Sequence, residues 1–323
     1  MLHSRGMRLG ASLADTVIIL NARAGTIRDL EPKAVEAQVR EAFAGHTESV
    51  AVELVEGDRF IAAIDKAAAS EAATIIVGGG DGSASYAARK LIDSDRTLGV
   101  LPLGTMNLFA RSLAIPTDLT QALDILAKAE PVRIDLGAVN GRIFHTLSGL
   151  GYFAEVARAR AQVREDTNLP FGRYIAAARA SLRAFVRPGI LELTVEADDG
   201  RRDIETYALF IGNNRLSDGG FDRPRLDEGL LEVHYAEGAD FGNRMQAAID
   251  LMAGRWRENP AIQSFTATTV TVTSRRPRLW VSVDGELTRL ETPLRFECRA
   301  GALNVLMPAA SDQPASDQRG EMA

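Results

Sequence analysis

Short apolar runs rich in β-branched residues alternate with helical patterns through the first 131 residues. The apolar runs that predict buried strands are 16–20, 50–55, 74–77 and 98–101. The segments whose spacing predicts helices are 32–43, 60–69, 84–91, 108–113 and 119–129. Strands that alternate with helices form a parallel sheet covered by helices on both faces. We therefore expect an α/β, doubly wound domain over residues 14–131.

After residue 131 the pattern changes to extended runs, which lie at 132–139, 142–147, 191–197, 207–212, 230–235, 268–273 and 278–283. Asn140-Gly141, Asp199-Gly200 and Asp284-Gly285 divide them, and such dipeptides make tight turns. Residues 132–300 are thus predicted to form a mostly antiparallel β domain with helical insertions at 153–163 and 173–186. The composition of residues 309–323 predicts a disordered tail.

The bulk composition excludes several classes of protein. A net charge of −6 over 323 residues argues against a duplex nucleic-acid binder, which would carry a basic surface. The single cysteine, Cys298, permits no internal disulfide and suits a reducing cytoplasm. No apolar stretch approaches the roughly 20 residues that a transmembrane helix needs, and the N-terminus does not resemble a signal peptide. We expect a cytoplasmic protein.

The strand predicted at 74–77 ends in a glycine-rich loop that contains Gly79, Gly80, Asp81, Gly82 and Ser83. Glycines at a strand-to-helix turn allow backbone N–H groups to approach a bound anion, and the following helix directs its positive end to the same place. This arrangement predicts a phosphate-binding loop. Because a carboxylate repels phosphate, Asp81 is expected to hold a metal-bound water or to orient an attacking hydroxyl.

A second loop of the same kind follows the strand predicted at 98–101 and contains Gly104 and Asn107. Neighbouring strands of a parallel sheet present such loops at one edge, so the two loops together favour a nucleotide site. The alternative is an ordinary glycine-rich turn. A Walker A loop is excluded because no Gly-Lys-Ser/Thr run is present, and Ser83 stands where a dinucleotide fingerprint requires its third glycine.

Four runs, in order along residues 15–308, resemble the bacterial soluble diacylglycerol kinase family, which is related to the sphingosine kinases. They are residues 79–83 (GGDGS), 102–111 (PLGTMNLFAR), 227–233 (DEGLLEV) and 283–286 (VDGE). The resemblance implies a nucleotide-binding α/β domain and a β-sandwich domain that binds lipid. It also implies that residues 302–308 return to complete the first domain.

The resemblance further implies roles for individual residues. The ATP site would be lined by the 79–83 loop, Thr105 and the loop that contains Asn21, Arg23 and Gly25. Asp227 and Glu228 would hold Mg²⁺, and Glu286 would be the general base. Two departures from the family pattern stand out: Glu228 occupies the place of a usual second Asp, and Leu108 the place of a frequent Asp.

Phosphoryl transfer to an alcohol requires positioned phosphates, a metal that neutralises their charge, and a base for the attacking hydroxyl. Glycine loops and carboxylates could supply these parts. Judged by spacing alone, however, residues 227–229 and 284–286 fit ordinary hairpin turns equally well.

Arginines accumulate between residues 153 and 187, where they outnumber the acidic residues by four; they are Arg158, Arg160, Arg164, Arg173, Arg179, Arg183 and Arg187. An apolar stripe accompanies them over residues 174–186. We hypothesise that this segment contacts an anionic membrane surface, the alternative being a core-packed helix with a solvated arginine edge.

The sequence favours an ATP- and Mg²⁺-dependent lipid kinase that phosphorylates a diacylglycerol-like hydroxyl at the inner face of the membrane. An NAD kinase-like enzyme and a non-catalytic nucleotide-binding regulatory protein are the alternatives. A homodimer is left open, and no nucleic-acid partner is expected.

Overall fold

The computed structural model describes residues 15–28, 30–165, 189–217, 223–237, 240–252 and 255–309. The chain divides into two compact units. Unit 1 contains the residues up to Arg133 together with those from Ala302 on, and unit 2 contains Ile134–Gly301. The chain crosses from one unit to the other in β5 (Glu130–Val139) and returns in β16 (Leu294–Met307).

Unit 1 is built on a parallel sheet with the strand order β2-β1-β3-β4, extended beside β4 by the end of β16. The strands are β1 (Thr16–Asn21), β2 (Val50–Val55), β3 (Thr74–Gly79) and β4 (Thr97–Pro102). Every residue of β3 and β4 is buried, as expected for central strands covered on both faces. The centre of this sheet is therefore a rigid base for the loops that follow these two strands.

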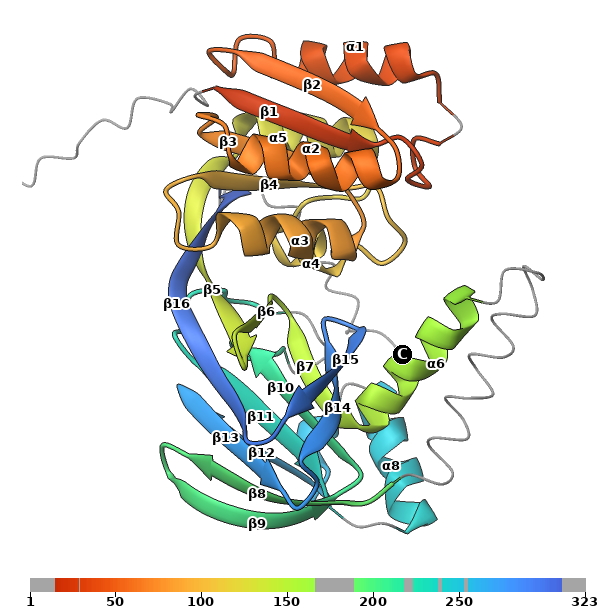
Figure 1. Cartoon of the computed structure of the whole chain (residues 1–323), viewed down its shortest axis with the longest axis vertical. Coiled ribbons are helices and arrows are strands. Elements are labelled where there is room, and N and C mark those ends of the chain that lie inside the picture. Colours follow the sequence, from red (N-terminus) through yellow and green to blue (C-terminus); the bar gives the residue numbers. More distant parts are fainter. Residues whose placement is uncertain are drawn as a thin grey trace, which may run out of the picture. The chain divides into compact units, whose positions relative to one another are not determined.

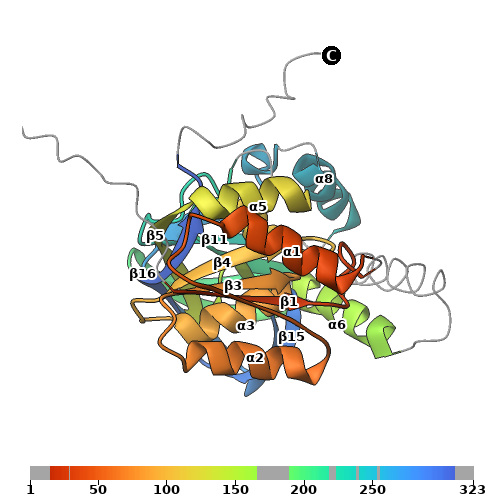
Figure 2. The ribbon, with the colours of Figure 1, turned by 90° about the horizontal axis from the view of Figure 1, so that it is seen from above.

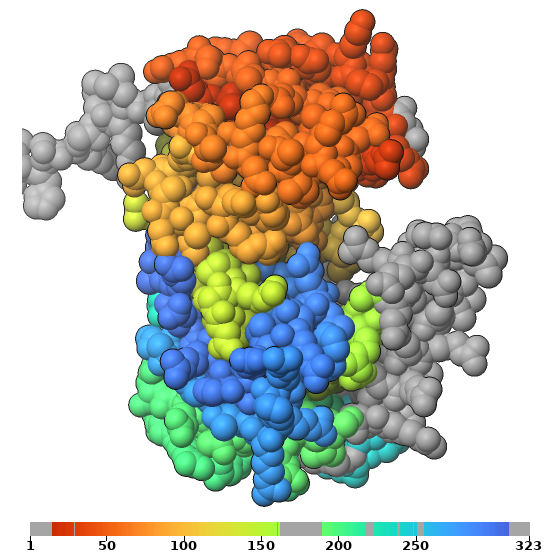
Figure 3. All heavy atoms as spheres, in the orientation of Figure 1, coloured from red at the N-terminus to blue at the C-terminus, as the bar shows by residue number. Residues whose placement is uncertain are grey.

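Helices cover both faces of the unit 1 sheet. They are α1 (Pro32–Phe43), α2 (Asp58–Ala68), α3 (Asp81–Leu91), the short α4 (Leu108–Ser112) and α5 (Leu119–Lys128). Figure 2 shows α1 and α5 on one face of the sheet and α2 and α3 on the other. In the space-filling view of Figure 3, α2 and α3 contribute to the orange surface of unit 1.

Unit 2 is an antiparallel β-sandwich. Its six-stranded sheet has the order β12-β11-β10-β7-β14-β15, and β7, β10 and β11 lie side by side in Figure 1. These strands are β7 (Leu147–Gly151), β10 (Ala208–Asn213), β11 (Leu231–Ala236), β12 (Ile262–Ala267), β14 (Arg278–Val283) and β15 (Glu286–Glu291). One hydrophobic core joins side chains from this sheet, such as Leu209 and Val281, to side chains from the other, such as Val272 and Phe296.

The second layer of unit 2 runs from the first half of β16 through β13 (Thr269–Ser274) and β8 (Leu191–Ala197) to β9 (Gly200–Thr206). The end of β5 pairs with β6 (Arg142–Phe144). In the described part of unit 2 the helical elements are α6 (Tyr152–Glu165), α8 (Phe241–Met252) and a 3-10 turn, η1 (Trp256–Glu258).

The predicted fold class is confirmed, and the structure corrects several boundaries. Helix α3 begins at Asp81 rather than at residue 84, so Asp81 belongs to the helix and not to the loop. The extended run predicted at 142–147 is two strands, β6 and β7, separated at His145 and Thr146. Helix α8 was not predicted. The predicted helix at 173–186 and tail residues 310–323 lie outside the described residues.

None of the helices in the described part of the chain has the length and the apolar character that crossing a bilayer requires.

Candidate active site

The two glycine loops of unit 1 touch each other. Strands β3 and β4 are parallel neighbours with Gly79 opposite Pro102, and the Leu103 N–H donates to the Gly79 carbonyl at 3.0 Å. Just beyond, the loops approach so closely that a Cβ added to Gly104 would lie 2.5 Å from the Gly80 Cα. The expectation that the loops share one sheet edge is therefore confirmed, and Gly104 is required for their contact.

The first loop passes directly into α3. Gly80 is the N-cap residue of this helix, and its carbonyl accepts the N–H groups of Ser83 and Ala84. The N–H groups ahead of these, those of Asp81 and Gly82, have no carbonyl partner that a helix could supply, so they are available to an anion. The Ser83 hydroxyl lies against Gly79, where an added Cβ would meet its Oγ at 2.7 Å. The end of the sheet after β3 thus combines backbone N–H donors with the Ser83 hydroxyl, and its glycines leave space for a ligand.

Asp81 connects the first loop to the second. Its Oδ1 accepts the backbone N–H of Phe109 at 3.0 Å, in the first turn of α4. The residue is partly exposed, and one oxygen of its carboxylate caps the first turn of α4. The structure therefore gives Asp81 a structural contact that the sequence reasoning did not foresee.

Asn107 shapes the second loop. It adopts a left-handed conformation with φ 52°, and its amide both accepts the Gly104 N–H and donates to the Gly104 carbonyl, each at 2.9 Å. The amide is buried in these contacts. Thr105, by contrast, is exposed at the tip of the loop. Of the two predicted nucleotide ligands, Thr105 has the more accessible side chain, and Asn107 holds the backbone around it.

The third predicted loop follows β1. The Asn21 Oδ1 accepts the Arg23 N–H at 3.0 Å, and the Arg23 guanidinium pairs with Glu56 at 3.0 Å while remaining 71% exposed. Gly25 is exposed. The Thr26 hydroxyl donates to the Leu103 carbonyl at 3.4 Å, which places this loop beside the second glycine loop. All three predicted loops therefore meet at the carboxyl ends of β1, β3 and β4.

In unit 2, Glu286 is exposed at the start of β15, directly after the turn from β14. The turn residues Asp284 and Gly285 have φ 47° and 82°, so the hairpin turn expected here is present. An exposed carboxylate on a short hairpin turn can meet a substrate hydroxyl without a large rearrangement of the chain.

Asp284 makes structural contacts that the sequence reasoning did not foresee. Its side chain is only 7% exposed, and its carboxylate accepts the N–H groups of His145, Thr146 and Leu147 at 2.9, 2.9 and 3.2 Å. The turn that carries Glu286 is thereby fixed to the break between β6 and β7. The sequence held no local signal of this contact, because it predicted 142–147 as one continuous run.

Asp227 and Glu228, the predicted Mg²⁺ ligands, occupy a turn before β11. Each carboxylate is already paired: Asp227 with Arg225 at 3.0 Å, and Glu228 with Arg215 at 2.9 Å. The Gly229 N–H of this turn donates to the buried Asp135 at 2.7 Å. Asp135 was not predicted as a site residue, although it is the only charged residue in the buried second half of β5, residues 134–139, which is a signal for a specific role.

Beside this turn lies a buried charged group. Glu232 accepts from the Arg257 Nη1 at 2.8 Å, and its other oxygen lies 3.1 Å from the His234 Nε2. Burial by itself would raise the pKa of Glu232, but the hydrogen bonds from His234 and Arg257 hold that pKa at about 2. Burial lowers the pKa of His234. The histidine ring packs between Phe210 and Trp256, with ring centroids 4.6 Å from each.

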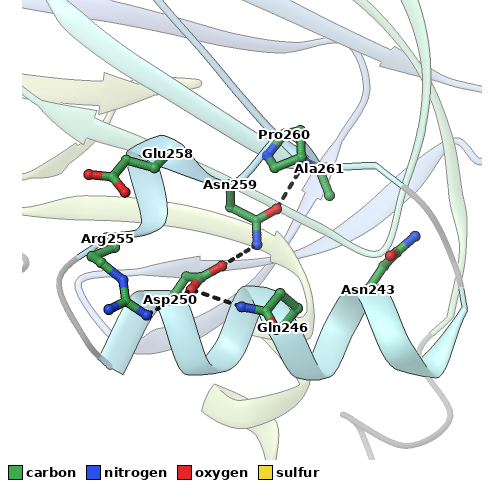
Figure 4. Close-up of a pocket in the computed structure, with 8 residues that line it drawn as sticks. All are labelled: Asn243, Gln246, Asp250, Arg255, Glu258, Asn259, Pro260 and Ala261. Carbon is green, nitrogen blue, oxygen red and sulfur yellow. Dashed lines mark hydrogen bonds and ion pairs between the residues drawn. The ribbon is translucent and has the colours of Figure 1, made fainter.

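A polar pocket of about 280 Å³ lies beside α8 and η1 (Figure 4). Figure 4 shows its polar groups directed at one another: Asp250 accepts from Gln246 at 3.0 Å and from Asn259 at 2.7 Å. Because these hydrogen bonds tie α8 to η1, the pocket has a structural role.

The arginine-rich segment is described only in part. Arg158 on α6 pairs with Glu155 at 3.2 Å and stacks on Trp280 at 4.9 Å. The side chains of Arg160 and Arg164 and the whole of residues 166–188, which include Arg173, Arg179, Arg183 and Arg187, lie outside what the structure describes.

Comparison with known proteins follows the division of the chain. Residues 15–139 match the family described as the diacylglycerol kinase catalytic domain, and residues 149–307 match the YegS C-terminal NAD kinase β-sandwich-like domain. The chain is 33% identical over 300 residues to a probable lipid kinase, YegS-like, of Pseudomonas aeruginosa, which covers 87% of this chain and 91% of the relative.

Two further relatives extend the comparison. A diacylglycerol kinase of Staphylococcus saprophyticus is 27% identical over 221 residues, covering 66% of this chain and 70% of that protein. The crystal structure of a diacylglycerol kinase from Bacillus anthracis covers 92% of this chain and 97% of its own with a TM-score of 0.69 and 18% identity, so it shows a shared fold. Both domain matches and the YegS-like relative agree with the motifs: the chain belongs to the bacterial diacylglycerol kinase family of lipid kinases.

Proposed function

We propose that this protein transfers the γ-phosphoryl group of MgATP to the hydroxyl of a diacylglycerol-like lipid. The observation that carries the proposal is the contact between the glycine loops after β3 and β4 at the N-terminus of α3. Backbone donors and a helix N-terminus directed at one place suit a polyphosphate, and the family membership supplies the lipid as acceptor.

In unit 1 the proposed roles follow from accessibility. Gly80, Gly82 and Ser83 would contact phosphate oxygens through backbone N–H groups and the hydroxyl. Thr105 would add a second hydroxyl from the neighbouring loop. The free oxygen of Asp81 would accept a hydrogen bond from a water bound to the metal of MgATP, while its other oxygen caps α4. Magnesium arrives with the nucleotide as part of the co-substrate.

In unit 2, Glu286 would act as the general base. As the lipid hydroxyl attacks the γ-phosphorus, the O–P bond forms, the bond to the β–γ bridging oxygen of ATP breaks, and Glu286 takes the hydroxyl proton. ADP is the leaving group. A positioned carboxylate base contributes roughly 10²–10⁴-fold to such a reaction.

A lipid acceptor requires peripheral contact with a membrane, which would place the enzyme at the inner face of the bilayer. Trp280 supports such a contact because it is 40% exposed and its ring centroid lies 4.9 Å from the Arg158 guanidinium and 5.8 Å from that of Arg289. Tryptophan and arginine both favour the headgroup region. Sedimentation of Trp280→Ala with phosphatidylglycerol vesicles tests this contact. Vesicle binding equal to that of the wild type would rule out a role of Trp280 in membrane contact.

A substrate panel tests the proposal. The purified protein is incubated with γ-labelled ATP, Mg²⁺ and, separately, diacylglycerol, sphingosine, ceramide, bacterial lipid extract and NAD. We expect label in diacylglycerol or in a lipid of the extract, and labelling slower on the order of 10²-fold with Asp81→Asn. Label in NAD would support an NAD kinase-like activity. ATP binding without any labelled product would support a regulatory nucleotide binder.

A further inference from the structure

The turn predicted to hold Mg²⁺ already carries a positive charge of its own. The Glu228 Oε1 accepts from the Arg215 Nη1 at 2.9 Å, and its Oε2 accepts the backbone N–H of the same arginine, also at 2.9 Å. The Glu228 side chain is 12% exposed. Both carboxylate oxygens of Glu228 therefore accept hydrogen bonds from Arg215.

Arg215 is held in place on its C-terminal side. The N–H of the next residue, Leu216, donates to the Glu232 Oε2 at 2.8 Å, and the Leu216 carbonyl accepts from the Arg257 Nη2 at 2.7 Å. Glu232 and Arg257 are themselves an ion pair, with an N–O distance of 2.8 Å. The Glu232–Arg257 pair is hydrogen-bonded to both the N–H and the carbonyl of Leu216. These bonds fix the backbone from which the Arg215 side chain extends.

The N-terminal side of Arg215 is equally constrained. Asn214 is fully buried and has φ 66°; its N–H donates to the Leu230 carbonyl at 3.0 Å. Its Oδ1 accepts the Glu228 N–H at 3.2 Å. The arginine and the glutamate are therefore joined through backbone contacts as well as through their charges, which distinguishes this pair from a mobile surface ion pair.

The donor set of the turn does not suit a resident Mg²⁺. Magnesium binds carboxylate oxygens directly and repels a neighbouring guanidinium, so an ion at Glu228 would have to displace Arg215. The remaining carboxylate, Asp227, is 59% exposed and paired with Arg225. Within the described residues, no group of three or more His, Cys, Asp or Glu side chains lies where it could hold a metal ion.

We propose that Arg215 is the built-in cation of the 227–229 turn and takes the place that a divalent ion would otherwise fill. Glutamate at position 228, one methylene longer than aspartate, reaches back to this arginine. The inference rests on the proposed function only in treating the turn as part of the kinase site. Its test contains neither nucleotide nor lipid, so its failure leaves the kinase proposal standing.

The probe is Mn²⁺ alone, added to the nucleotide-free protein and followed by its electron paramagnetic resonance signal. The wild type should show no ion whose binding depends on Glu228. Arg215→Gln should gain a site that binds Mn²⁺ roughly tenfold or more tightly than the wild type does, because the repelling charge is gone. Arg215→Gln/Glu228→Asp restores a short carboxylate and should bind at least as well, and Arg215→Gln/Glu228→Gln should lose the gained site.

Thermal unfolding provides the second readout. Removing the arginine should lower the melting temperature of Arg215→Gln, and MgCl₂ should restore part of the loss in this variant without affecting the wild type. A wild-type protein that binds one Mn²⁺ per chain, lost in Glu228→Gln, would overturn the proposal. So would Arg215→Gln with unchanged melting temperature and no gain in Mn²⁺ affinity.

Discussion

The carboxylate of Asp81 accepts the backbone N–H of Phe109 at 3.0 Å and so joins the helix after β3 to the helix after β4. The same residue thus also fixes the contact between the two glycine loops. One oxygen accepts the N–H group in α4, and the proposed function gives the other oxygen a task in the reaction.

Asp81→Asn separates these tasks. The amide oxygen can still accept the Phe109 N–H, so the fold should be kept, whereas the charge that orients a metal-bound water is lost. We expect kcat to fall on the order of 10²-fold with an unchanged circular dichroism spectrum. Activity within twofold of the wild type would leave Asp81 with a capping role alone.

Gly104→Ala and Gly80→Ala form a matched pair in the two contacting loops. The added Cβ would lie 2.5 Å from backbone at position 104, but at position 80 it would meet only the Gly104 Cα at 3.6 Å, an ordinary contact. Gly104→Ala should therefore lower thermal stability, while Gly80→Ala should fold normally and raise the KM for ATP. Equal melting temperatures for the two variants would contradict the close approach of the loops.

Asp284→Ala should destabilise unit 2. Three backbone N–H groups would lose their acceptor, and a buried donor left unpaired costs about 1–3 kcal/mol. Both tryptophans, Trp256 and Trp280, lie in unit 2, so their fluorescence during urea unfolding follows this unit. Asp284→Asn keeps an acceptor oxygen and should lose less of the free energy of unfolding than Asp284→Ala. Equal losses in the two variants would argue against the hydrogen-bonded role of Asp284.

Unit 2 should become less stable as the pH falls below about 6.5. Burial lowers the pKa of His234 in the folded protein, so the unfolded chain takes up this proton first and is favoured by acid. For a single proton the slope is at most about 1.4 kcal/mol per pH unit. Below pH 4.5, protonation of Glu232, whose pKa is about 2 in the folded protein, adds to the loss.

The measurement is the urea midpoint from tryptophan fluorescence at pH 7.5, 6.5 and 5.5. His234→Gln should flatten the dependence on pH, whereas His46→Gln, in unit 1, should not. An unchanged slope in His234→Gln would show that another group causes the effect.

Strands and loops of unit 1 were predictable because they depend on local pattern. Buried β-branched runs followed by glycine turns specify β3 and β4, whose adjacency follows from a parallel sheet. Strand β2 and helix α1 have the predicted bounds, the latter because Pro32 begins the helix. The start of α3 was placed too late because Asp81 and Gly82 have the composition of a loop.

The contacts made across long stretches of sequence could not be predicted. Asp284 fixes a backbone segment 137–139 residues away, and Arg215 pairs with a carboxylate 13 residues away. Such contacts depend on tertiary packing, and no local pattern specifies them. The resemblance therefore implied Asp227 and Glu228 as magnesium ligands without any sign of the arginines that pair with both carboxylates.

The most direct test is the rate of phosphatidic acid formation from diacylglycerol and labelled MgATP by the wild type, Glu286→Gln and Glu205→Gln. Glu205, on β9, is an exposed strand glutamate like Glu286 and serves as the control. The account predicts labelled phosphatidic acid with the wild type and Glu205→Gln, and a rate lower by roughly 10²–10⁴-fold with Glu286→Gln. Wild-type protein that binds ATP but labels no lipid, or Glu286→Gln at the wild-type rate, would contradict it.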